Sequence, residues 1–322
     1  MFVTVRWIDT MIQWLPRGVD RRVRIFAWLS LAAQVLLIGT GGAVRLTGSG
    51  LGCPTWPRCT AESFTTTQEM GVHGIIEFGN RLLTFVLVVV AVGMFLAVLR
   101  YRAQRRDLFV LALLQGLSIP LQAVLGGITV LTGLNPYIVG AHFVVSICLV
   151  TLTTVLLYRV YRGPRGTQRR VPLWIAALTH AASFLVAVTV LLGILTTGSG
   201  PHAGDSETPR NGLNSELLQH LHSWPAYALM LATVVLLIGV FAGGAQMVPV
   251  RPWVSGLLAV EMLQVVVGVT QARLGLPAIL VGIHMVLAAV LVAAMTATVL
   301  SERSTARLVR APSIPEPSTA RV

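Results

Sequence analysis

The residues best suited to chemistry lie in the apolar stretch 72–83, which carries a histidine, a glutamate, an asparagine and an arginine. At helical spacing, His73, Glu77 and Asn80 fall on one face of the predicted helix. Ionisable side chains inside a membrane span cost free energy, so they usually mark a functional site. A carboxylate at this position can take a proton or orient a reacting group. Its alternative role is structural, as the ion-pair partner of Arg81 four residues further on.

Three more histidines, His142, His222 and His284, each lie a few residues inside the end of an apolar run. His222 and His284 are expected at similar depth in one helix bundle, which favours bis-imidazole ligation of a haem. A single histidine in a span more often serves helix packing through a hydrogen bond. In the first half, Asn80 stands where the second histidine is expected, so iron there would be held through His142, alone or with another group. His73 is about 10 Å from Asn80 by helix rise and is an awkward substitute.

Two cysteines, Cys53 and Cys59, lie in a loop that is expected to face outward. A disulfide is stable in that compartment, and the pair is either a structural staple or a reactive thiol pair. A metal site is disfavoured because two ligands alone do not make one. The remaining candidates are Cys148, His180, His202, His220 and Glu261. They are expected to be structural or incidental, and proton conduction is an alternative role for Glu261.

The composition identifies a membrane protein. Of its 322 residues, 55% are hydrophobic and only 11% are charged, whereas a soluble domain carries about 25% charged residues. The net charge of +12 does not indicate nucleic-acid binding, because the arginines lie in short loops between apolar runs. No cleavable signal peptide is evident, since the first apolar run begins near Ile25 and is long enough to span.

The apolar runs predict an all-α membrane protein with eight transmembrane helices. The spans are placed at 25–45, 72–99, 108–131, 137–158, 172–196, 217–242, 252–273 and 277–300. One side of the bundle is expected to hold 19 of the 24 arginines, together with both termini. The positive-inside rule places that side in the cytoplasm of a bacterial cell and the unequal loops 46–71 and 197–216 outside. Residues 1–23 are amphipathic, and the tail after residue 301 is expected to be disordered.

An internal repeat divides the chain. Residues 121–142 align without a gap on residues 263–284, each matched pair lying 142 positions apart, and both copies end in histidine. The same offset pairs Glu77 with Gln219 and Asn80 with His222. The chain is therefore predicted to form two four-helix bundles in the same orientation, related by an axis along the membrane normal. Chance similarity between apolar sequences is the alternative.

The loop at residues 41–59, with its pattern Gly-Ser-Gly-x-x-Cys-Pro-x-Trp-Pro-x-Cys, resembles the first outer loop of the haem A synthase family. The Glu-x-x-[His/Asn]-Arg motif that starts at Glu77 is similar to the family's motif, and His142, His222 and His284 match its histidine positions. The resemblance covers roughly residues 25–300. Asn80 departs from the many members that have histidine there, and the second outer loop lacks the cysteine pair that some members carry.

This resemblance implies an enzyme that oxidises the C8 methyl of haem O to a formyl group through successive hydroxylations with water-derived oxygen. It implies a haem B cofactor, held by His222 and His284 in residues 172–300. It also implies substrate haem in residues 25–160, with His142 as ligand and Glu77 essential for the chemistry. Asn80, Arg81 and His73 are expected to contact the same substrate haem. Residues 161–171 would be a basic cytoplasmic linker. Because side chains cannot oxidise an unactivated methyl group, a redox cofactor is required.

Partners implied by this interpretation are haem O, the lipid bilayer, an unidentified electron acceptor, a haem O synthase and a second copy of the chain. Two other classes of function compete with it. A di-haem electron-transfer protein linked to quinone would need haem pairs at two depths, whereas the ligand candidates all lie toward one face. A transporter built from parallel repeats needs no haem, and it would leave the histidine pairs and the cysteine loop without a role.

Overall fold

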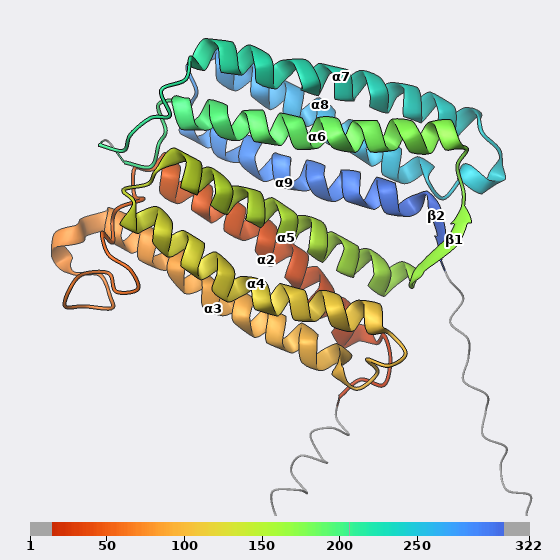
Figure 1. The fold of residues 1–322 in the computed structure, drawn as a ribbon, viewed down its shortest axis with the longest axis horizontal. Coiled ribbons are helices and arrows are strands. Elements are labelled where there is room, and N and C mark those ends of the chain that lie inside the picture. Colours follow the sequence, from red (N-terminus) through yellow and green to blue (C-terminus); the bar gives the residue numbers. More distant parts are fainter. Residues whose placement is uncertain (1–14, 206, 306–322) are drawn as a thin grey trace, which may run out of the picture.

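The computed structural model describes residues 15–205 and 207–305, which form a bundle of long helices (Figure 1). Eight helices within these residues are long and apolar enough to cross a membrane. They are α2 (Arg21–Leu46), α3 (Gly71–Leu99), α4 (Arg106–Leu131), α5 (Pro136–Arg162), α6 (Leu173–Ser199), α7 (Ser215–Ala242), α8 (Arg251–Arg273) and α9 (Ala278–Ser301). The predicted all-α, multi-pass membrane architecture is confirmed, and the predicted spans overlap these helices one for one.

Several helices begin where a side chain caps the first turn. Asp20 accepts from the Val23 amide at the start of α2, and Asn135 accepts from the Tyr137 amide at the start of α5. Asn214 caps α7 in the same way. These oxygens satisfy backbone N–H groups that have no partner within the helix, so polar residues at the ends of the apolar runs set where the helices start.

Two tight turns join consecutive helices by the same backbone conformation. Gly133 and Leu134, between α4 and α5, both have φ of 59°. Gly275 and Leu276, between α8 and α9, have φ of 74° and 61°. A left-handed residue directly after a helix turns the chain sharply, and glycine adopts it without steric cost. Each turn therefore reverses the chain within a few residues and holds the paired helices antiparallel.

The helices pack as two groups of four. In the first group α2 packs on α3, α3 on α4, α4 on α5, and α5 back on α2. In the second group α6, α7, α8 and α9 pack in the same cyclic order. Helices α3 and α5 are therefore diagonal to each other in the first group, as α7 and α9 are in the second. The shared order is what the proposed repeat leads one to expect; the repeat itself stays a prediction from the sequence.

The two groups meet along α2, α5 and α9, as Figure 1 shows. Ile38, Val150 and Ala289, one from each of these helices, form a buried cluster at the seam. Gly39 lets α2 approach α9 closely, because a Cβ atom there would lie 3.1 Å from Cγ2 of Val286. Small residues at helix contacts allow the close van der Waals packing that holds membrane helices together.

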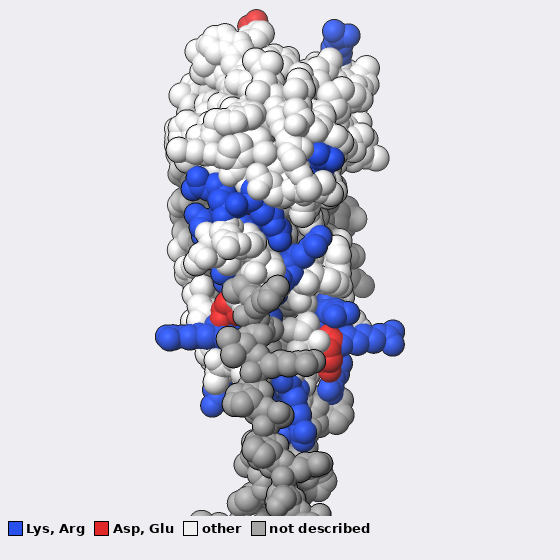
Figure 2. Space-filling model, turned by 90° about the vertical axis from the view of Figure 1, so that its right-hand side faces the viewer, with Lys and Arg blue, Asp and Glu red and all other residues white. Residues whose placement is uncertain are grey.

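The two ends of the bundle differ in charge. We call the end with the loops 47–70, 132–135, 200–214 and 274–277 the Cys-loop end, and the opposite one the clip end. Figure 2 views the clip end and shows arginine gathered across it. The described arginines of this end are Arg17, Arg21, Arg22, Arg24, Arg100, Arg102, Arg105, Arg106, Arg159, Arg162, Arg165, Arg169, Arg170, Arg251 and Arg303.

A short antiparallel sheet ties the clip end together. Strand β1 (Arg165–Arg169) pairs with β2 (Arg303–Thr305), so that Arg165 lies opposite Thr305. The predicted disorder from residue 301 onward is therefore wrong for residues 303–305, because their backbone groups find partners in the segment that links the two helix groups. The amphipathic interpretation of residues 1–14 and the disorder expected for residues 306–322 concern residues outside those described.

Candidate functional site

Glu77 is buried near the Cys-loop end of α3, six positions after its first residue, with 5% of its surface exposed. Its Oε2 atom accepts a hydrogen bond from the backbone N–H of Cys53, with an N–O distance of 2.6 Å. Its Oε1 atom accepts from Arg81 Nε at 3.2 Å and from Arg81 Nη2. The predicted ion pair with Arg81 is thus present, and the carboxylate is also bonded to the cysteine loop.

That loop is closed by a disulfide between Cys53 and Cys59, and both residues are fully buried. Trp56, between the two cysteines, lies directly over α4. A Cβ atom at Gly127 of α4 would come within 2.4 Å of the Trp56 ring, so only glycine leaves room for this contact. The loop is therefore packed down on the first helix group, with Glu77 beneath it. Cys148 is a free cysteine on α5.

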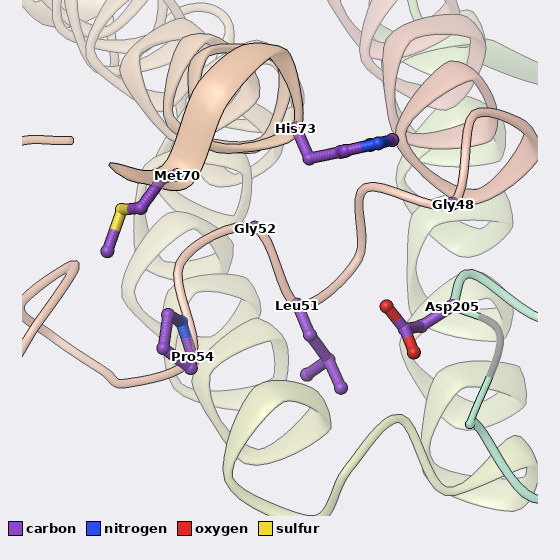
Figure 3. A pocket seen from close by; sticks show the side chains of 7 residues that line it. All are labelled: Gly48, Leu51, Gly52, Pro54, Met70, His73 and Asp205. Atoms are coloured by element: carbon purple, nitrogen blue, oxygen red, sulfur yellow. The ribbon is translucent and has the colours of Figure 1, made fainter. Parts of the chain in front are cut away.

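A cavity of about 530 Å³ is lined in part by the same loop. Figure 3 shows its lining residues: Gly48, Leu51, Gly52, Pro54, Met70, His73 and Asp205. The His73 ring bonds to Ser49 through Nδ1 at 2.9 Å, and the His73 residue is exposed. Because Asp205 comes from the loop between α6 and α7, the cavity joins the two helix groups at their Cys-loop end.

His142 and Asn80 project from the diagonal helices of the first group. His142 lies six positions after the start of α5, and its Nδ1 atom is buried without a hydrogen-bond partner among the described residues. A Cβ atom at Gly126 would be 3.5 Å from Cε1 of the same ring. The Asn80 amide oxygen accepts a hydrogen bond from Thr40 of α2 at 2.8 Å. His73 bonds to Ser49 at the loop and lies seven positions before Asn80 on α3.

His222 and His284 face each other across the second group. Their ring centres are 6.1 Å apart and their ring planes cross at 71°. His222 Nδ1 donates to the carbonyl of Thr189 on α6 at 2.9 Å. Since a carbonyl only accepts, this bond leaves the lone pair of His222 on Nε2, the nitrogen that can bind a metal.

Two glycines lie beside these rings. A Cβ atom at Gly193 of α6 would be 2.9 Å from Cε1 of His222, and one at Gly268 of α8 would be 3.2 Å from Cε1 of His284. A side chain at either position would push against the imidazole. The second helix group is therefore shaped so that both rings turn toward the bundle interior.

This arrangement fits a haem better than a bare metal ion. In the part of the chain that the structure describes, no group of three or more histidine, cysteine or acidic residues is placed to hold a metal ion. A bare ion needs about four ligands, whereas a porphyrin supplies four nitrogens and leaves the protein one or two. Two imidazole nitrogens, each about 2 Å from one iron atom, place the ring centres about 6 Å apart. The 6.1 Å between His222 and His284 meets this requirement.

The other candidates lie away from these groups. His220 and His180 are exposed, and His202 bonds to the carbonyl of Leu276 in a loop. Glu261 is buried on α8, where one of its oxygens accepts from Thr233 of α7 and the other is unpartnered.

Sequence reasoning missed the residues that support the site. Thr189 acts through its carbonyl, which any residue supplies, so no sequence signal reveals it. Thr40 acts through its side-chain hydroxyl, and a single threonine in an apolar span carries no signal of a distant partner. Gly126 and Gly268 did carry a signal, because they are matched to each other in the proposed repeat and each lies beside the histidine of its own copy.

Comparison with known proteins places these features in context. A family model described as "Cytochrome oxidase assembly protein" matches residues 24–296. The Heme A synthase of Geobacillus kaustophilus is 28% identical over 186 residues, which cover 57% of this chain and 55% of that protein. That of Halalkalibacterium halodurans is 31% identical over 140 residues, 43% and 46% of the two chains. That of Listeria welshimeri is 27% identical over 149 residues, 46% and 48%. The chain spans about half the length of the curated relatives that it matches.

Proposed function

The chain belongs to the cytochrome oxidase assembly protein family, and from this premise we propose that it is a haem A synthase. It oxidises the C8 methyl of haem O to a formyl group by successive hydroxylations. Water supplies the oxygen, and each of the two hydroxylations releases two electrons and two protons. The resulting geminal diol then loses one water to give the formyl group. The observation that carries this proposal is the facing pair His222 and His284 in one helix group, with the buried Glu77 at similar depth in the other.

His222 and His284 of the second helix group would hold the resident cofactor, haem B. Thr189 keeps His222 in the tautomer that presents Nε2, and Gly193 and Gly268 leave room for the two rings. A haem bound there would supply one-electron transfer. The protein's part is to orient the two imidazoles and to surround them with apolar helices.

The first helix group binds the substrate, haem O. His142 is the proposed iron ligand, and Asn80 occupies the diagonal position that His222 holds in the other group. Hydrogen bonding to Thr40 orients the Asn80 amide. His73 lies at the cavity near the loop, where it can contact the polar edge of the substrate. Arg81 stabilises the neighbouring cysteine loop through hydrogen bonds to its carbonyls. One imidazole leaves the substrate iron under-ligated, as suits a haem that must be released.

Glu77 is the proposed acid–base group for the protons that leave during oxidation. Each carboxylate oxygen has two lone pairs, and the bonds from Cys53 and Arg81 leave capacity for a further proton. Glu77 is buried, and it bonds to Cys53, whose neighbour Gly52 lines the cavity at the Cys-loop end. In this proposal the cavity is the route by which water and protons reach the site.

The orientation follows from the arginines. Because arginine is gathered at the clip end, we place that end and both termini in the cytoplasm of a bacterial cell, with the site facing outward. A haem O synthase is the partner that delivers substrate, and an acceptor in or near the membrane takes the electrons. A second copy of the chain is a further partner.

The di-haem electron-transfer alternative finds less support. It requires ligand pairs toward both faces of the membrane, and His142, His222 and His284 each lie six or seven positions inside the Cys-loop end of their helix. Extraction of the haems from the purified protein separates the two functions. Two permanent haem B groups, with no haem O or A, would favour electron transfer.

The direct test is haem analysis of cells that express this chain with a source of haem O. Haem A should accumulate with the wild-type chain. Glu77→Gln should reduce it at least a hundredfold while the purified protein keeps its haem B. Glu69→Gln, which removes an exposed carboxylate nearby, is the matched control and should behave as wild type. Unchanged haem A from Glu77→Gln would remove this residue from the mechanism.

A further inference from the structure

All the guanidinium donors of Arg81 are used inside the protein. A guanidinium group has five N–H bonds. Nε and one N–H of Nη2 point to Glu77. The other three donate to backbone carbonyls of the cysteine loop: Nη2 to Cys53 at 2.9 Å, Nη1 to Thr55 at 3.1 Å and Nη1 to Arg58 at 3.3 Å. No N–H of Arg81 is left over for the carboxylates of a bound substrate.

The three carbonyls share one origin. Cys53, Thr55 and Arg58 all lie within the ring that the Cys53–Cys59 disulfide closes. The same ring also donates the Cys53 N–H to the second oxygen of Glu77. Glu77, Arg81 and the disulfide ring therefore form one closed set of contacts, in which each part is bonded to the other two.

We propose that the disulfide ring and Arg81 form a mount that fixes the Glu77 carboxylate for catalysis. Arg81 is then a positioning residue and not a ligand of the substrate. The disulfide is a structural part of the mount and does not carry electrons. This inference rests on the proposed function, because it assigns the mount to the acid–base group of that reaction.

Glu77 needs such a mount because its side chain has several rotatable bonds. A carboxylate acts as an acid or base only when it is held within hydrogen-bonding reach of the reacting group. Arg81 donates hydrogen bonds to one carboxylate oxygen and the Cys53 N–H donates to the other, so the carboxylate cannot rotate without breaking these bonds. The disulfide keeps the three carbonyls directed at one guanidinium group. In an open loop of the same sequence, these carbonyls could move apart.

Burial of the cysteines supports the structural role. A dithiol that carries electrons must be reached by the thiol or other group that reduces or oxidises it. Cys53 and Cys59 are both fully buried. Besides its disulfide partner, the Cys59 sulfur lies 3.5 Å from the thioether sulfur of Met70. A thioether does not take part in thiol–disulfide exchange.

The test separates substrate binding from conversion in the full-length, haem B-loaded protein. The variants are Arg81→Gln, Arg81→Lys and the double substitution Cys53→Ser with Cys59→Ser. Haem O bound to each purified variant is measured by extraction and chromatography, and haem A formation is measured in membranes supplied with haem O. The matched control is Arg210→Gln, because the hydrogen bonds of Arg210 within residues 15–205 and 207–305 go to the loop carbonyls of Thr208 and Pro201.

We expect bound haem O to stay within about twofold of wild type in every variant. Haem A formation should fall at least tenfold in Arg81→Gln and in the double cysteine variant. Arg81→Lys should recover part of the activity, because an ammonium group keeps the charge but lacks the fork of donors. Arg210→Gln should match wild type.

Loss of bound haem O in Arg81→Gln, with normal conversion of what remains, would overturn the mount and make Arg81 a substrate ligand. Wild-type conversion by Arg81→Gln would overturn it as well. Absence of haem A from the wild-type chain would instead defeat the proposed function.

A second measurement needs no variant. Maleimide added to the wild-type protein during turnover should leave Cys53 and Cys59 unlabelled, as read by mass spectrometry. Labelling that appears only with turnover would show a disulfide that opens in each cycle and would overturn its structural role.

Discussion

The imidazole rings of His222 and His284 face each other across the second helix group with 6.1 Å between their centres. The two residues come from diagonal helices and are 62 positions apart in the sequence. Only the packing of four helices brings them to this separation, and a single iron atom bonded to both nitrogens requires about the same distance.

Removal of either imidazole should therefore abolish the bis-histidine haem. We expect His222→Ala and His284→Ala to lose the low-spin absorption and paramagnetic resonance signals of haem B in the purified protein. His220→Ala is the control, because His220 is exposed two residues from His222 and should leave the spectrum unchanged. A normal low-spin signal in both His222→Ala and His284→Ala would refute the proposed ligation.

A side chain at Gly268 should displace His284. The Cβ atom of Gly268→Val would lie 3.2 Å from the ring and its methyl groups would lie beyond, so the imidazole must move. We expect haem B content to fall at least tenfold, the size of effect that loss of ligand support usually causes. Gly256→Val on the same helix meets nothing within 4 Å and is the matched control. Equal haem content in the two variants would contradict the prediction.

A histidine at position 80 should provide the substrate site with a second axial ligand. Asn80 occupies the place on α3 that is diagonal to His142 on α5. In a Glu77→Gln background, which prevents turnover, bound haem O in Asn80→His should show a low-spin, bis-histidine spectrum. Asn80→Leu removes the amide without adding a ligand and should not. Identical spectra for Asn80→His and the background protein would mean that the two side chains do not converge on the iron.

Glu302, at the clip end beyond α9, should make stability depend on pH. Burial raises the pKa of this carboxyl, and the hydroxyl of Thr179 with the charges of Arg169 and Arg303 only partly offsets it. Because the folded-state pKa is above the unfolded one, the protonated form stabilises the fold, and this contribution is lost as the pH rises through the folded pKa.

Glu302→Gln should consequently raise the free energy of unfolding by about 1 kcal/mol at pH 8. The gain should shrink as the pH falls toward the ordinary carboxyl pKa. Thermal unfolding in detergent at pH 8 and pH 5 measures both. Glu207→Gln, which removes an exposed carboxylate, should show neither effect. A gain that is equal at both pH values would show that titration of Glu302 is not its cause.

Much of the fold could be predicted because a membrane helix is determined by the residues of its own segment. A run of apolar residues long enough to cross must be helical, since no water is present to satisfy its backbone groups. The bounds of α3 and α8, for example, lie within one residue of the spans predicted from composition. Strand β2 escaped prediction because its partner β1 is far away in the sequence. The matched residues Arg169 and Arg303 are 134 positions apart, and Arg165 and Thr305 are 140 positions apart.

Part of the candidate site could likewise be predicted from the sequence, and part could not. Residue type and depth along each helix identified Glu77, His222 and His284 without any knowledge of packing. The disulfide expected between Cys53 and Cys59 is confirmed, whereas the sequence left open whether the pair is structural or redox-active. The four-residue spacing indicated the ion pair of Arg81 with Glu77, whereas no local pattern indicates that the other Arg81 donors bond to carbonyls of the cysteine loop.

The amino-acid sequence by itself determined which segments cross the membrane, how deep each polar side chain lies and which family the chain resembles, because hydropathy and helix rise act residue by residue. Tertiary structure decided which polar groups meet: the diagonal approach of His222 to His284, the bond that His222 donates to the Thr189 carbonyl, and the loop that closes over Glu77. Those contacts join segments far apart in the chain, and their geometry is set by how helices pack against one another, which depends on all the side chains along each contact.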